Sequence, residues 1–340
     1  MFQKISLFIF FLPLLSTLLS LHVLNNYRIF NKSKRLGGTI ITIIIEISLI
    51  VYYIFFPNYL LAKDFWSLLI GITILFIGGL WDDIKNLNWK KQLLFQSLAI
   101  IPILAAGDTI DHIKLPGEST FWIPVFFTYL LSFIWSLLVI NSLNWFDGSD
   151  GLAGTVGLIT LLILATLSIN LPVNQPATFL LCLLISGSVM GFLFFNFSPA
   201  YFHLGTTGIW VLGFLIAVIS IYSGGKVATA SLVLGIPIIN FIYVSLARLI
   251  EGKLPTVGKD RLHFHEKLID SGWKCWQINI IFGVISVLLG VGALLSQTQG
   301  KIFLLMILTG FLLYFLFFFE KHSSQNSTAK KQENSLRQGQ

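Results

Sequence analysis

Residues 121–169 read FWIPVFFTYLLSFIWSLLVINSLNWFDGSDGLAGTVGLITLLILATLSI, in which two apolar runs enclose the polar segment 144–151. The runs, 121–143 and 152–169, are long enough for a helix to cross a hydrocarbon core about 30 Å thick. Polar groups at a membrane boundary are costly and are therefore commonly functional. The pattern predicts two membrane helices joined by a segment that forms part of an active site.

The whole chain has the same apolar character. Hydrophobic residues make up 55% of 340 positions and the mean hydropathy is +0.83, whereas a soluble chain has about 45–50% apolar residues. The apolar residues fall in eleven blocks: 5–24, 39–56, 65–81, 93–106, 121–143, 152–169, 177–195, 209–223, 227–247, 276–296 and 302–319. No short alternating segments of the kind found in membrane β-barrels occur. We predict an all-α polytopic membrane protein with about eleven transmembrane helices.

The basic residues predict the orientation. If the loops alternate between two sides, 17 of the 22 Lys and Arg residues lie on one side and 5 on the other. By the positive-inside rule the richer side is cytoplasmic, which puts the N-terminus outside and the C-terminus in the cytoplasm. The net charge of +7 is then mainly a topology signal, and a nucleic-acid partner is not expected.

The chain ends and the cysteines add little chemistry. The first block lacks a small-x-small cleavage site after it, so we interpret it as a retained span and not as a signal peptide. Residues 1–319 are expected to form one integral-membrane domain, and the polar residues 320–340 a disordered cytoplasmic tail. Cys182 and Cys275 indicate neither a disulfide framework nor a zinc site.

Four polar clusters fall on the predicted cytoplasmic side. They are Asp82–Asp83, Asn144–Asp150, Asn196–Gly208 and Asp260–Glu266. The loops of the other side hold short sequences without such clusters. This distribution predicts one functional site at the cytoplasmic surface. Glu46 stands apart within the second block, as a packed carboxyl or as part of a substrate path.

Adjacent carboxylates occur in the first cluster. Because the charges of Asp82 and Asp83 repel each other, they favour a bound cation or a shared proton. Mg²⁺ carrying a diphosphate is a suitable oxygen-bound partner. The alternative is a solvated helix terminus neutralised by the neighbouring lysines, which are Lys85, Lys90 and Lys91.

The central cluster has a polar residue at every third position: Asn141, Asn144, Asp147 and Asp150. On a helix that tightens toward its end, this spacing keeps the four side chains on a broad common face. Gly148 and Gly151 would let a ligand or another helix approach the backbone closely. The alternative is a turn that uses Asn and Asp as turn formers.

The other two clusters each allow two interpretations. Thr207 and Gly208 precede an apolar block, so amides at that helix start could hold a phosphate, or Thr207 could simply cap the helix. In the last cluster, Arg261, His263 and His265 could neutralise a pyrophosphate. The alternative there is a charged interfacial loop.

Taken in order, the clusters resemble the motifs of the polyprenyl-phosphate N-acetylhexosamine-1-phosphate transferase superfamily, glycosyltransferase family 4. Residues 141–151 match its pattern Asn-x-x-Asn-x-x-Asp-Gly-x-Asp-Gly. The other matching segments are Arg35-Leu36-Gly37-Gly38, Gly79–Asp83, Lys91 with Gln96, Asn196 with Pro199 and Ala200, and Asp260–His265. The resemblance covers about residues 5–319.

The chain departs from the family pattern in two of these motifs. The family usually has Gly-Asp-x-Gly where this chain has Gly205-Thr206-Thr207-Gly208, and the replaced aspartate is one credited with coordinating Mg²⁺. The His-x-His-His motif carries Glu266 in place of its third histidine. Mg²⁺ can be held by one or two carboxylates plus water and substrate phosphates, so losing one ligand need not abolish catalysis.

The resemblance implies a function. A polyprenyl phosphate would receive a HexNAc-1-phosphate from a UDP-sugar, with release of UMP, as the priming step of cell-envelope glycan synthesis at the inner (cytoplasmic) membrane. It implies Mg²⁺, or Mn²⁺ in its place, and it is compatible with a homodimer. The implied catalytic residues are Asp82, Asp83 and Asp147, and the implied metal ligands are Asp147 and Asp150. The implied substrate-binding residues are Asn141, Asn144, Lys91, Asn196, Arg261, His263 and His265.

Two alternatives come from other functional classes. Thr206 is compatible with a non-catalytic homologue that binds lipid or a nucleotide-sugar. A transporter would require broken helices and ionisable residues near the middle of the membrane, where Glu46 is a candidate.

Overall fold

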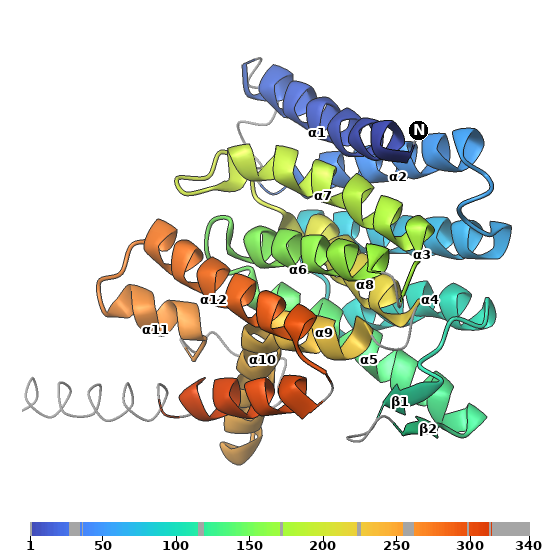
Figure 1. Ribbon diagram of the computed structural model, residues 1–340. Helices are drawn as coiled ribbons and strands as arrows, with labels where there is room; N and C mark the ends of the chain where they lie inside the picture. The colour runs from blue at the N-terminus through green and yellow to red at the C-terminus, as the bar shows by residue number, and fades with distance from the viewer. Residues whose placement is uncertain are drawn as a thin grey trace, which may run out of the picture.

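The computed structural model describes residues 2–26, 35, 37–114, 119–170, 173–222, 226–253, 262–297, 299–312 and 314. The described part is predominantly helical, as the sequence predicts (Figure 1). Its helices are α1 (Phe2–Asn26), α2 (Gly37–Phe55), α3 (Ala62–Lys85), α4 (Trp89–Ala105), α5 (Val125–Phe146), α6 (Leu152–Ile169), α7 (Pro176–Asn196), α8 (Gly205–Ile221), α9 (Lys226–Val233), α10 (Gly235–Ile250), α11 (Phe264–Asp270) and α12 (Cys275–Leu295). A further helix runs over Gln299–Leu312.

Each of the eleven apolar blocks contains helix, and seven helices of the described residues are long and apolar enough to cross a membrane. An eighth span is available if α9 and α10, bent by 70° at their junction, are taken together. The structure therefore confirms the prediction of a polytopic helical membrane protein, but it does not confirm eleven spans. The bend divides the ninth block, because Pro237 in the first turn of α10 has no N–H to continue the helix from α9.

α8 forms the centre of the fold. It packs on α2, α3, α5, α6 and α9, and every residue from Thr207 to Ile221 is buried. A helix that is apolar on all sides belongs in such a core. α1, α7, α6 and α12 lie one beside the next (Figure 1), and of these α6 packs on α8. The first turn of α8 thereby comes to lie against the ends of α2 and α3, where the polar clusters gather.

A small β-hairpin precedes α5 and was not expected from the sequence. Strands β1 (His112–Lys114) and β2 (Thr120–Trp122) pair antiparallel, with His112 opposite Trp122. The apolar block predicted from residue 121 therefore begins as a strand, and its helix starts only after Pro124. Apolar composition alone cannot separate a short strand from the start of a helix.

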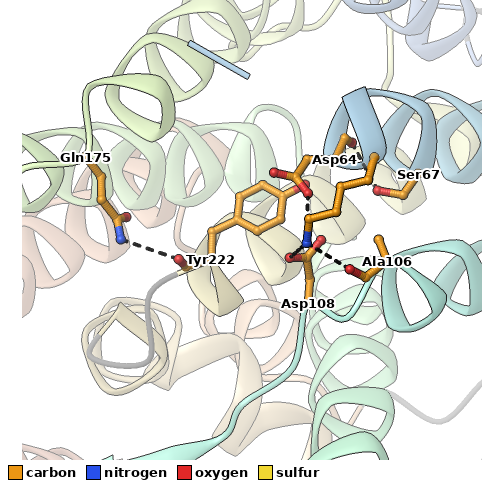
Figure 2. Close-up of polar contacts among 7 residues, drawn as sticks. Asp64, Ser67, Ala106, Asp108, Gln175 and Tyr222 are labelled. Atoms are coloured by element: carbon orange, nitrogen blue, oxygen red, sulfur yellow. Dashed lines mark hydrogen bonds and ion pairs between the residues drawn. The ribbon is translucent and has the colours of Figure 1, made fainter. Parts of the chain in front are cut away.

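A polar cluster joins the start of α3 to the segment that follows α4, and it lies at the opposite end of α3 from the aspartate pair (Figure 2). The Lys63 Nζ donates to the Ala106 carbonyl at 2.8 Å. It also lies 3.5 Å from Asp64 Oδ1 and 3.7 Å from Asp108 Oδ1. Burial, and then the charge of Asp64, raises the pKa of Asp108 from 3.8 to about 6, against the opposing effect of Lys63.

This cluster predicts how stability depends on pH. A carboxyl whose pKa is raised by folding binds its proton more tightly in the native state, so its contribution is complete below 3.8 and is lost as pH rises through about 6. The melting temperature in detergent should therefore fall between pH 5 and pH 7, and the fall should be smaller in Asp108→Asn. Identical pH profiles for the two proteins would contradict this account of Asp108.

Candidate functional site

A cavity of about 430 Å³ lies where the end of α3, the α5–α6 turn, the end of α7 and the start of α8 meet. Three carboxylates line it, from Asp83, Asp147 and Asp150. The other lining residues are Arg35, Asn144, Gly148, Ser149, Asn196, His203, Gly205, Thr206 and Ile209. The sequence clusters around residues 83, 147 and 200 thus meet at one place, as expected. The cavity can accommodate a polar ligand next to a concentrated negative charge.

The α5–α6 turn carries two of the three carboxylates. α5 ends at Phe146, Asp147 is its C-cap, and α6 starts after Gly151. Gly151 has φ +75°, a conformation that favours glycine, and it reverses the chain within a few residues. The helix therefore ends inside the predicted three-residue repeat, so only its last members reach the cavity.

Asp150 is held in place from the α7–α8 segment. Its Oδ2 accepts a hydrogen bond from the Ala200 amide at 3.0 Å, and its Oδ1 lies 3.7 Å from His203 Nδ1. The Asn196 Nδ2 donates to the Phe202 carbonyl at 2.7 Å and so folds this segment over the cavity. Asn196 lines the cavity, and its side-chain hydrogen bond to Phe202 is structural.

Asp83 is held by the first turn of α8. The amides of Thr206 and Thr207 donate to its two carboxylate oxygens at 2.7 and 3.0 Å, and the Thr207 hydroxyl donates at 2.6 Å. These amides were one candidate for holding a phosphate, and in the structure they hold Asp83. Gly205 makes the contact possible, because its φ is +59° and a Cβ there would come within 2.8 Å of the Asp83 carboxylate.

The surroundings of Asp147 disfavour its charged form. Burial, followed by the charges of Asp150 and Asp83, raises its pKa to about 7. Because the three carboxylates disfavour one another's charged forms, the site is suited to bind a cation.

The donor set fits Mg²⁺ bound together with a substrate. Among the described residues, no three His, Cys, Asp or Glu side chains form a complete metal cage. Mg²⁺ commonly needs only one or two carboxylates, with water and phosphate oxygens completing its six ligands. Asp147 and Asp150, which face the same cavity, are suitable for that role.

Several residues predicted for the site lie outside the cavity wall. Asp82 is buried and accepts hydrogen bonds from the Leu87 amide, the Gln92 amide group and the Thr206 hydroxyl. Asn141 donates to Gln96 Oε1 at 2.8 Å and so joins α5 to α4. Both therefore make structural contacts in the described fold.

Of the predicted basic residues, Lys91 lies away from the cavity wall. The Lys91 Nζ lies 5.7 Å from the centre of the Trp81 ring on the exposed surface. Arg261 falls outside the described residues.

The two histidines stack on each other behind the cavity. Their ring centroids are 5.5 Å apart. His265 is buried, and burial followed by the charge of His263 lowers its pKa to about 3, so it is neutral at physiological pH. A Cβ on Gly148 would overlap the His265 imidazole. His265 thus supports the cavity wall from behind.

Arg35 and His203 bring a guanidinium and an imidazole to the cavity, and the sequence alone assigned a role to neither. Arg35 belongs to the glycine motif before α2, and His203 to the segment before α8. Nothing in their spacing along the sequence shows that they line the same cavity as Asp83 and Asp150.

Comparison with known proteins places the sequence among phosphosugar transferases. The sequence model of glycosyl transferase family 4 matches residues 65–224. A probable undecaprenyl-phosphate N-acetylglucosaminyl 1-phosphate transferase of Bacillus subtilis is 26% identical over 72% of this chain and 70% of its own. A phospho-N-acetylmuramoyl-pentapeptide-transferase of Staphylococcus carnosus is 27% identical over 75% and 82%. One of the same description from Rippkaea orientalis is 30% identical over 66% of each chain.

Proposed function

Because the chain belongs to glycosyl transferase family 4, we propose that it transfers a HexNAc-1-phosphate from a UDP-sugar to a polyprenyl phosphate. An oxygen of the lipid phosphate attacks the β-phosphorus of the UDP-sugar and forms the new P–O bond. The bond from that phosphorus to the bridging oxygen breaks, and UMP leaves with the electron pair. The lipid product is a polyprenyl diphosphate sugar, which primes synthesis of a cell-envelope glycan.

The observation that supports this function best is the gathering of Asp83, Asp147 and Asp150 around one cavity at the ends of apolar helices. Phosphoryl transfer needs positioning and charge stabilisation more than covalent chemistry. A cavity at a helix end can receive a soluble nucleotide-sugar from water and a lipid phosphate whose chain stays in the bilayer. The chemistry of both partners fits this position.

The residues take distinct roles in the proposal. Asp147 and Asp150 would hold Mg²⁺, which when bound supplies charge stabilisation to the diphosphate. Asp83 directs its carboxylate to the acceptor phosphate, and we favour it over Asp82 because only Asp83 lines the cavity. Arg35 and His203 contact phosphate oxygens, and Asn144 seats the uridine side.

We also propose that the cavity faces the cytoplasm, where UDP-sugars are found, with the N-terminus outside. The excess of Lys and Arg on the loops of that side supports this orientation. Single cysteines placed at Ser149, in the cavity wall, and at Ser119, just before β2, should react from opposite sides of the membrane in sealed vesicles of the Cys182→Ala, Cys275→Ala background. Labelling of both from the same side would contradict the orientation. A homodimer stays a prediction from the resemblance.

The function is tested by supplying the purified protein with a polyprenyl phosphate, Mg²⁺ and a panel of UDP-sugars. We expect UMP to appear in equal amount to lipid-linked sugar phosphate with at least one UDP-HexNAc. Absence of both products across the panel would reject the assignment.

A second candidate function is binding without turnover, and Thr206 is the observation that favours it. Its hydroxyl donates to Asp82 at 2.6 Å, where the family pattern has a carboxylate. In that case the wild type would bind UDP-sugar without releasing UMP, and Thr206→Asp would restore turnover. Turnover by the wild type eliminates this candidate.

A further inference from the structure

The two threonines at the start of α8 contact the two adjacent aspartates at the end of α3. The Thr206 hydroxyl donates to Asp82 Oδ2 and the Thr207 hydroxyl donates to Asp83 Oδ2, both at 2.6 Å. The backbone amides of the same two threonines occupy both oxygens of Asp83. Each carboxylate of the pair therefore has its own hydroxyl donor from one helix turn.

These contacts compensate the repulsion between the two adjacent carboxylates. Two negative charges next to each other need compensation, and amides and hydroxyls at the positive end of a helix provide it. Asp82 receives further donors from Leu87 and Gln92 and is buried, whereas Asp83 remains open to the cavity. The pair is thus divided into one structural and one accessible carboxylate.

Close backbone packing keeps the first turn of α8 in position. A Cβ on Gly79 would lie 2.5 Å from the Thr207 Cα, and a Cβ on Gly38 would lie 2.5 Å from the Gly208 amide nitrogen. α8 therefore packs on α2 and α3 without intervening side chains. The threonine donors cannot move far without moving the core helix itself.

We propose that Thr207 is a positioning residue, which together with the Thr206 amide orients the Asp83 carboxylate toward the cavity, while Thr206 anchors Asp82 out of it. In this chain the aspartate pair is compensated by helix-end donors, so Asp83 needs no metal to hold its orientation. The carboxylates left for a cation are then those of the α5–α6 turn. This inference rests on the proposed function for its kinetic consequence, and its structural part stands alone.

The kinetic test compares Thr207→Val with Thr207→Ser. Valine keeps the shape and removes the donor, so misplacement of Asp83 should lower kcat about 10²-fold with little change in KM for the UDP-sugar. Serine keeps the hydroxyl and should stay within about threefold of the wild type. Thr160→Val is the matched control, because Thr160 is also buried and its hydroxyl bonds only within its own helix.

An equal loss of kcat in Thr207→Val and Thr207→Ser, or a wild-type kcat in Thr207→Val, would overturn the kinetic role of Thr207. If the wild type itself shows no transfer, the proposed function fails, and the structural part is decided by thermal unfolding.

That second measurement is a double-mutant cycle of Thr207→Val with Asp83→Ala. If the two groups act on each other, the melting-temperature shift of the double variant should be clearly smaller than the sum of the single shifts. Additive shifts would show that Thr207 does not hold Asp83, and would overturn the proposal without reference to activity. The pair Thr160→Val with Asp83→Ala should be additive.

Discussion

Asp150→Asn is expected to lower the turnover number for phosphosugar transfer about a thousand-fold. A bound metal supplies several kcal/mol of transition-state stabilisation, and each 1.36 kcal/mol is tenfold in rate. An amide keeps the contact of Asp150 with the Ala200 amide but lacks the charge that would hold the ion. Asp83→Asn is expected to lower the turnover number by a similar factor, because Asp83 is the accessible member of its pair. Rates of UMP release at saturating substrates measure both effects.

The matched control for these variants is Asp111→Asn. Asp111 is exposed next to His112 of the hairpin, outside the cavity wall, so its loss of charge should leave the rate unchanged. Asp82→Asn separates the two members of the pair. Asp82 accepts three hydrogen bonds and does not line the cavity. Asp82→Asn should therefore lower the melting temperature clearly, while the turnover number of the folded fraction changes little. Full activity in both Asp83→Asn and Asp150→Asn would remove the proposed site.

Gly38→Ala is expected to have the largest effect on stability. A Cβ at this position would overlap the Leu204 carbonyl oxygen and lie 2.7 Å from the Gly208 Cα. These are backbone atoms, so the helices α2 and α8 must separate, at a cost at or above the upper end of the about 1–3 kcal/mol typical of overpacking. Displacement of the α8 start should also move the donors to Asp83 and lower activity. The melting temperature in detergent and the rate of the folded fraction measure the two consequences.

Gly310→Ala provides the control for that variant. Gly310 is a helical glycine whose Cβ would meet nothing within 4 Å, and alanine favours helix over glycine by about 1 kcal/mol. Its melting temperature should therefore stay equal or rise. If Gly38→Ala were as stable as Gly310→Ala, the close packing of α2 on α8 would be wrong.

The sequence predicts the class of fold well because a bilayer imposes one strong requirement, long apolar helices. It does not predict the bend between α9 and α10 or the hairpin before α5, because both depend on one or two residues within an apolar block. Pro237 and Pro124 are visible in the sequence, but whether a proline bends, starts or only ends a helix is decided by its neighbours in space.

The candidate site is predictable in part for a related reason. A three-residue repeat identifies Asn144, Asp147 and Asp150, and all three line the cavity. The same repeat includes Asn141, one helical turn earlier in α5, whose side chain donates to Gln96 of α4 and does not reach the cavity. Sequence shows which residues are polar at a membrane boundary, but the partner that each one contacts comes from another helix. For this reason the structural role of Asp82 and the cavity position of His203 appear only in three dimensions.

The central claim is that the sugar moves together with its phosphate, at the cavity of Asp83, Asp147 and Asp150. It is tested most directly with a UDP-HexNAc labelled with ³²P at the β-phosphate. The account predicts that the label enters the polyprenyl lipid while unlabelled UMP is released, and that Asp150→Asn suppresses both. Label that stays on released UDP while the sugar reaches the lipid would contradict it.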